Sequence, residues 1–146
     1  MAAFNLYDKF RETRLNPSGP AVSGTLKLML VTSAYVPNQN IHQYKSSVTN
    51  EVAGTGYTAR GNTCSTPTAT VDGSGNFVFD ANDPAAWAQS AGGFTNARRA
   101  VLYYDTGVDG TSVLVGYTDD AGADLGNLAA DLQVTFNAAG IYTSAR

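Results

Sequence analysis

An alternating apolar pattern in residues 25–32 is the feature that most constrains the fold of this chain. Leu26, Leu28 and Leu30 occupy every second position. Because successive side chains of a strand point to opposite faces, the three leucines share one face of a predicted strand. The other apolar stretches are equally short and are separated by turns that contain Gly, Asp or Asn. This spacing is typical of an antiparallel sandwich or barrel.

Two hairpins are predicted from turn chemistry. Residues 68–71 and 77–79 flank an Asp-Gly-Ser-Gly sequence, whose glycines supply the positive φ angles that a tight return needs. Residues 97–104 and 112–117 are nearly continuously apolar after two arginines, and they flank a second turn at residues 105–110. Both hairpins are expected to contribute to a single β domain.

Two further segments carry local signals. Residues 131–136 alternate three apolar residues with polar ones, which predicts a last strand. Residues 83–91 begin with Asp83 as a potential N-cap and Pro84 at the first helical position, and Gly92 follows the end. This arrangement predicts a short helix.

The N-terminal segment predicts an arm. Phe4, Tyr7 and Phe10 recur at a spacing of three and would share one face of a short amphipathic helix. A connector rich in Pro and Gly follows and cannot continue a helix. We therefore divide the chain into an arm, residues 1–23, and a β domain, residues 24–146. A lone short helix is marginal in water, so its aromatic face must dock on its own sheet or on a neighbouring subunit.

Charge is sparse and unevenly distributed. Charged residues make up 14% of the chain, where a soluble domain usually carries about 25%. Residues 1–60 hold six basic and three acidic groups, a net of +3, and residues 61–145 hold two basic and nine acidic groups, a net of −7. This polarity favours head-to-tail contact between a basic arm containing Arg11 and Arg14 and an acidic edge of another copy.

Several classes of partner are disfavoured. A formal net charge of −3 without a cluster of Lys and Arg argues against nucleic acid. The apolar stretches are too short to span a bilayer, and the N-terminus lacks the pattern of a signal peptide, so we expect a cytoplasmic chain unless a particle carries it out. Cys64 is the only cysteine and His42 the only histidine, which leaves no internal disulfide and no zinc ligand set. We expect no cofactor.

Two short motifs offer chemistry. Asp105 begins an Asp-Thr-Gly tripeptide, the signature of aspartic proteases, whose small members pair two such aspartates in a dimer. The apolar-apolar-Gly strand that a protease needs elsewhere is represented only by the nearby residues 114–116, so a hairpin turn explains the tripeptide better. Asp119, Asp120 and Asp124 form a carboxylate-rich loop that could hold calcium, but their spacing does not match an EF-hand and favours a solvated turn.

A further pattern lies in four segments, residues 54–57, 97–107, 113–119 and 136–141. Together they resemble a family of tailed-phage virion structural proteins. Members of that family carry an Arg-Tyr-Ala-Val-Leu-Tyr-x-Asp-Thr-like strand, a Leu-Ile-Gly-Tyr-x-Asp-like strand and a closing Phe-x-x-x-Gly-like segment. This chain departs from the pattern at Arg99, where an aromatic residue is common, and in its N-terminal arm. The resemblance implies a particle protein without a catalytic site, and a strand around Trp87.

These observations lead to one functional expectation. We predict a mostly β protein, an antiparallel sandwich or barrel with a short N-terminal helical arm. It would act as a non-enzymatic capsid decoration (cement) protein on the exterior of a virion and be made in the cytoplasm of the host bacterium. Its partners would be the major capsid protein and further copies of itself in a dimer or trimer. The predicted interface residues are Phe4, Tyr7, Phe10, Arg11 and Arg14.

The N-terminal arm suggests a mechanism for this function. Two alternative functions also remain open. Arm residues would reach across a subunit boundary, so that deletion of residues 1–20 would leave a folded domain with weakened binding to particles. One alternative is a tail or baseplate component that binds glycans on the host surface. The other is a dimeric aspartic protease acting through Asp105.

Overall fold

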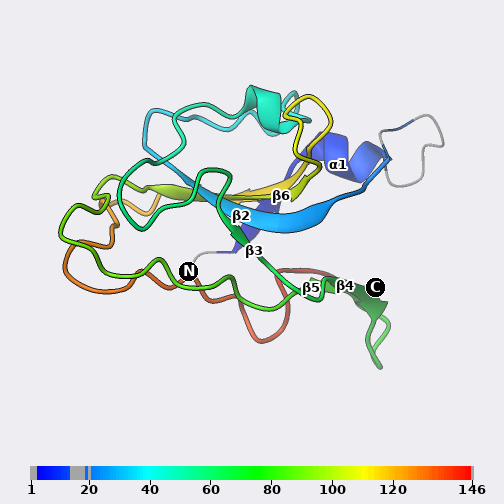
Figure 1. The fold of residues 1–146 in the computed structure, drawn as a ribbon. Coiled ribbons are helices and arrows are strands. Elements are labelled where there is room, and N and C mark those ends of the chain that lie inside the picture. Colours follow the sequence, from blue (N-terminus) through cyan, green and yellow to red (C-terminus); the bar gives the residue numbers. More distant parts are fainter. Residues whose placement is uncertain (1–2, 14–18, 20, 146) are drawn as a thin grey trace.

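The chain forms two antiparallel sheets (Figure 1). The computed structural model describes residues 3–13, 19 and 21–145. The mostly β prediction is confirmed: one sheet has five strands, the other has three, and a short helix lies near the N-terminus. Over the described ranges the sheets do not close into a barrel. None of the helices found there is long and apolar enough to cross a membrane.

The five-stranded sheet is built around the predicted strand and the second predicted hairpin. The strand predicted over residues 25–32 is β2 and pairs along its whole length with β6. The pairing of β6 with β7 confirms the hairpin and contains a register shift between Leu102 and Tyr103. The strands, in spatial order, are β1 (Phe4–Leu6), β7 (Val113–Thr118), β6 (Arg99–Asp105), β2 (Thr25–Val31) and β3 (Asn62–Thr63).

Both faces of this sheet are buried. The three leucines of β2 belong to one apolar cluster with Trp87 and Phe94, as their alternation predicted. Met29 and Val31 project to the other face and belong to a second cluster that includes Tyr35. In Figure 1 the segment after β2, drawn in cyan, runs above the sheet, and irregular green and orange segments run below it. Loops, and not only a second sheet, therefore cover the core.

The three-stranded sheet is smaller. It consists of β4 (Thr68–Val71), β5 (Phe77–Asp80) and β8 (Tyr142–Ser144), in the order β4-β5-β8. The first predicted hairpin, β4–β5, is confirmed. The Asp72 carboxylate accepts hydrogen bonds from the amides of Ser74 (2.8 Å) and Asn76 (2.9 Å). These bonds hold the pKa of Asp72 below its usual range, because they stabilise the charged form.

The predicted amphipathic helix over the first aromatic residues is wrong. Phe4 lies in β1, which pairs with β7, and α1 (Asp8–Thr13) begins only after Tyr7. Phe4 and Tyr7 therefore face different apolar clusters on the two sides of the sheet. Pairing with β7 gives the backbone groups of β1 hydrogen-bond partners. A single helical turn in water would be less stable. Arg14 and the predicted connector, apart from Gly19, lie outside the described residues.

Two other local predictions are wrong. Residues 131–136 do not form a strand, and residues 83–91 do not form a helix. Instead Trp87 and Leu132 form an isolated antiparallel bridge, with reciprocal N–H to C=O hydrogen bonds of 2.9 Å. The Asp83 carboxylate accepts the amide of Phe136 at 2.7 Å rather than capping a helix. Burial of Trp87 and long-range hydrogen bonds override the local helix signals here.

Candidate interaction surface

A network of ion pairs surrounds Asp105 at the end of β6. The Nε atom of Arg60 lies 3.1 and 3.0 Å from the two carboxylate oxygens of Asp105. Lys27 Nζ lies 3.1 Å from Oδ2 of the same carboxylate, and the Gly107 amide donates to Oδ1 at 2.9 Å. Hydrogen bonding from Arg60 is the main cause that holds the pKa of Asp105 well below its usual range. Asp105 is therefore a charged, saturated acceptor.

This geometry disfavours the aspartic protease hypothesis. A protease dyad needs two carboxylates that share one proton, so one of them must have a raised pKa. Arg60 and Lys27 act in the opposite direction on Asp105. The tripeptide that begins at Asp105 instead forms the turn between β6 and β7, with Gly107 at a φ of 86°. The position of this tripeptide in a hairpin connection, as predicted from the sequence, is confirmed.

The ion pairs of this network join residues of the basic first half of the chain to residues of its acidic second half. Arg60, from the basic half, also pairs with Asp109 from the acidic half. Lys45, only 7% exposed, lies 3.5 Å from an oxygen of Asp109 and 3.7 Å from one of Glu51. These pairs attach the segment before β3 to the β6–β7 turn. Three basic residues of the first half, Lys27, Lys45 and Arg60, therefore pair with Asp105 and Asp109 of the second half within one chain.

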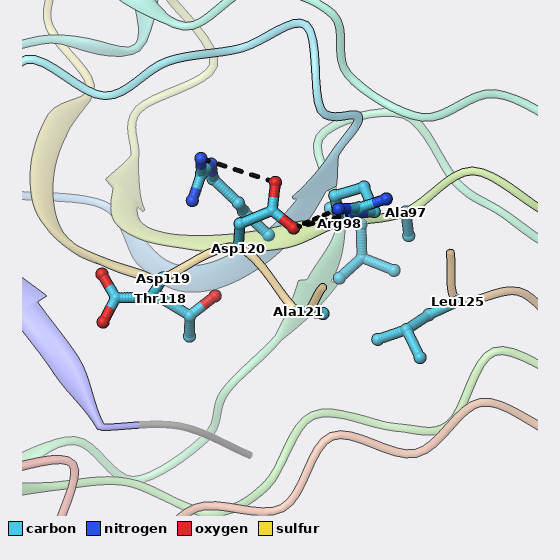
Figure 2. Close-up of a pocket in the computed structure, with 9 residues that line it drawn as sticks. Ala97, Arg98, Thr118, Asp119, Asp120, Ala121 and Leu125 are labelled. Carbon is cyan, nitrogen blue, oxygen red and sulfur yellow. Dashed lines mark hydrogen bonds and ion pairs between the residues drawn. The ribbon is translucent and has the colours of Figure 1, made fainter. Parts of the chain in front are cut away.

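Carboxylates of the acidic loop at residues 119–124 also form ion pairs with arginines of the same chain. Asp120 Oδ1 lies 2.6 Å from Arg98 Nη2, and Asp120 Oδ2 lies 3.6 Å from Arg99 Nη2. Figure 2 shows the Asp120 carboxylate directed toward Arg98, and both residues line, together with Leu125, a cavity of about 320 Å³. Asp124 pairs with Arg98 at 3.3 Å. In the part of the chain that the structure describes, no group of three His, Cys, Asp or Glu side chains is arranged to hold a metal ion.

The predicted interface residues do not share one surface. Phe4 and Tyr7 are buried in the chain's own core. Phe10 is half-buried and packs against both apolar clusters, and Arg11 is exposed with Asp8 at 3.8 Å. The structure therefore leaves Phe10 and Arg11 at the surface, while Arg14 lies outside the described residues.

Phe10 lines an apolar groove between α1 and the three-stranded sheet. The groove has a volume of about 190 Å³, below the roughly 300–1,000 Å³ of typical small-molecule sites. Its floor includes the buried Phe79, and its rim includes Phe77, which is 40% exposed. A groove of this size suits side chains of a protein partner better than a whole cofactor. Its lining residues are Leu6, Phe10, Ala69, Phe77, Phe79, Tyr104 and Tyr142.

Among the residues that the structure describes, an open strand edge lies beside this groove. β4 is at the edge of its sheet, and all four of its residues, Thr-Ala-Thr-Val, are exposed. Val71, at its end, is 68% exposed. β4 carries neither charge nor proline, the usual devices that prevent an edge from pairing with another chain. We define the groove residues together with β4 as the groove–edge surface.

Sequence reasoning found only Phe10 of this surface. Ala69, Phe77 and Tyr142 come from three strands that are distant in sequence, and only the fold brings them together. One signal was available, because residues 68–71 form a predicted strand without a single charge. Comparisons with known protein families, with curated proteins and with solved structures found no match to this chain.

Proposed function

We propose that this chain is a non-enzymatic structural component of a tailed-phage particle, a capsid decoration protein that binds the major capsid protein lattice and further copies of itself. The observation that carries the proposal is the groove–edge surface, where an uncharged open strand borders an apolar groove. Such an edge presents unpaired backbone N–H and C=O groups to a strand of another chain. A partner strand would gain both these hydrogen bonds and apolar contacts.

The segments that resemble virion proteins form the central scaffold of this fold, and this supports the proposal. Two of the resembling segments contain β6 and β7, the centre of the five-stranded sheet. Tyr57, from a third segment, accepts a hydrogen bond from the Leu30 amide at 3.0 Å and stacks on Trp87. The resembling residues thus hold the fold together, and the contact surface lies outside most of them.

Sparse surface charge is also consistent with a lattice protein. Several of the few charged side chains are paired within the chain, as the networks around Asp105 and Asp120 show. Interface centres are depleted in charged residues, so a groove–edge surface that exposes Phe77 and Val71 fits this pattern. The mechanism is mechanical, because each contact buries apolar area and shares load between neighbouring subunits of the shell.

Binding to purified particles tests the proposal. Particles from a lysate of the bacterium that carries this gene are separated on a density gradient, and the chain is detected by mass spectrometry. The proposal expects the chain to sediment with the shells at a fixed ratio to the major capsid protein. Its absence from particles would contradict the proposal, and recovery only with detached tails would favour the tail or baseplate alternative.

A pair of matched variants tests the surface. Val71→Lys places a charge at the open edge, whereas Val108→Lys places one at a similarly exposed position, 60% exposed, on the β6–β7 turn. The purified variants are added to shells that lack the protein, and occupancy is measured after sedimentation. We expect Val71→Lys to reduce occupancy by at least about 10-fold, because a charge at an interface centre must be desolvated. Equal occupancy for both variants would exclude β4 from the interface.

A further inference from the structure

The only histidine of the chain is part of a buried hydrogen-bonded relay. The hydroxyl oxygens of Tyr7 and Tyr35 lie 2.9 Å apart, and the Tyr35 hydroxyl lies 2.9 Å from His42 Nδ1. The backbone N–H of Asn38 also points at Nδ1, at 3.2 Å. The two tyrosines are almost completely buried, whereas the His42 ring is half-buried at the outer end of the relay.

The Asn38 contact assigns a direction to the relay. A backbone N–H can only donate, which gives Nδ1 of His42 the acceptor role and places the proton of a neutral ring on Nε2. Nδ1 has one lone pair, which the Asn38 N–H and the Tyr35 hydroxyl share. The Tyr35 hydroxyl then donates to Nδ1 and accepts from the Tyr7 hydroxyl. A proton on Nδ1 would face the Asn38 N–H and would take the acceptor away from the Tyr35 hydroxyl proton. One of the two buried hydroxyl protons of Tyr7 and Tyr35 would then have no acceptor in the relay.

The loop that carries His42 holds the junction between β1 and α1. The Asp8 amide donates to the Gln39 carbonyl at 2.9 Å. The Gln39 side chain donates in turn to the Leu6 carbonyl at 2.8 Å. With the contact between Tyr7 and Tyr35, these bonds attach residues 35–42 to residues 6–8. The N-terminal strand and helix are thus held from the same loop that contains the relay.

We propose that His42 is a pH-sensitive latch: its neutral form holds the loop of residues 35–42 against the β1–α1 junction, and protonation opens this contact. The proposal is independent of the function proposed above. It deals with how firmly the N-terminal segment is attached, whatever the partner of the chain is.

The charged and titratable groups near the relay lie on three other elements, α1, β6 and β7. Arg99, from β6, donates to the Tyr35 carbonyl and brings positive charge to the relay. Tyr117, from β7, packs on Tyr7 with ring centroids 4.9 Å apart. Asp8, the acid at the start of α1, lies toward Arg11, and within the described ranges no carboxylate forms an ion pair with His42. Burial lowers the pKa of His42 below its usual range.

The lowered pKa of His42 determines the sign of the pH effect. The unfolded chain binds a proton on His42 at a higher pH than the folded chain does, so folding releases that proton in the interval between the two pKa values. The contribution of the latch is complete above about pH 6.5, the ordinary pKa of histidine, and is lost as the pH falls below it.

Two NMR measurements on the full chain test the latch. Ring ¹⁵N shifts at about pH 7.5 report the tautomer, and amide hydrogen exchange, corrected for its intrinsic pH dependence, reports the junction. We expect the Nε2–H tautomer, and protection of the Asp8 amide that falls about 2- to 10-fold by about pH 5, the effect of one lost hydrogen bond. The Leu102 amide in β6 serves as the internal control, and its protection should change much less.

Two variants separate the latch from general acid destabilisation. His42→Asn keeps an oxygen that can accept from Asn38 but does not titrate, so the pH dependence at Asp8 should disappear. Tyr35→Phe removes the relay and should lower the protection of Asp8 already at neutral pH. A proton on Nδ1 at neutral pH, pH-independent protection in the natural chain, or the same pH dependence in His42→Asn would each overturn the proposal.

Discussion

The two sheets of this chain differ in how they are covered. In the five-stranded sheet, every residue of β2 after Thr25 is buried or half-buried, and apolar clusters pack on both faces. In the three-stranded sheet, all of β4 is exposed, and Phe79 is the one buried residue of β5. The first sheet therefore carries the stability of the fold, and the second offers backbone edges and apolar side chains to other molecules. Substitutions in the two sheets should have different consequences.

The largest expected effect comes from deletion of residues 2–12. This deletion removes β1 and the side chains of Phe4, Leu6 and Tyr7 from the covered sheet. Each buried side chain contributes about 1.5–3 kcal/mol, so the loss is on the order of 5 kcal/mol, comparable to the whole stability of a small domain. Urea unfolding followed by circular dichroism measures it. An unchanged midpoint would mean that the segment is the detachable arm that its sequence suggested.

Asp105→Asn should have the next largest effect. It leaves Arg60 and Lys27 without their shared carboxylate, which is 6% exposed, and should cost about 3 kcal/mol. Asp109→Asn, at a half-exposed position, is the graded control and should cost less. Because the pKa of Asp105 is lowered by folding, its contribution is present above about pH 4 and is lost as the pH falls further. Thermal melts of the variant should therefore depend less on acid pH than those of the natural chain.

A smaller effect is expected for Gly116→Ala in β7. A Cβ atom there would lie 2.9 Å from the Asn5 carbonyl oxygen of β1, and such overpacking costs roughly 1–3 kcal/mol. Gly110→Ala is the matched control, because its Cβ would have no neighbour within 4 Å. Chemical denaturation of both variants gives the comparison. Equal stabilities would show that β1 does not approach β7 as closely as the structure places it.

The smallest effect on folding is expected at the open edge. Val71→Lys should change the free energy of unfolding by less than about 0.5 kcal/mol, because Val71 is exposed. Phe79→Ala, in the next strand of the same sheet, should cost about 3 kcal/mol. Calorimetry of the two variants therefore compares the exposed edge of the small sheet, at Val71, with the buried side chain of Phe79, which packs this sheet against the core. A large loss in Val71→Lys would make β4 part of the core and would undermine its use as a binding probe.

The parts of the fold that sequence predicted well are those with local causes. The leucines of β2 alternate because each alternate side chain enters the same cluster, and the β4–β5 turn is read from Asp72 and its glycines. The wrong predictions depend on partners far along the chain. Trp87 is extended because Leu132 bridges it, although its own neighbours favour a helix.

The candidate surface shows the same limit. A spacing of three between Phe4, Tyr7 and Phe10 could not distinguish a helix from a short strand followed by a helix, because the segment is too short for its period to decide. The groove gathers residues from both sheets and from α1, so no single stretch of sequence could indicate it. Only the uncharged character of residues 68–71 was visible in advance.

An image reconstruction of intact particles tests the central claim most directly. The account predicts density for this chain on the outer surface of the shell, with β4 and the groove beside it in contact with a neighbouring subunit and the face of the five-stranded sheet that carries Met29 and Val31 outside the contact. The account would be contradicted by shells without this density, or by a bound chain whose groove and β4 face the solvent.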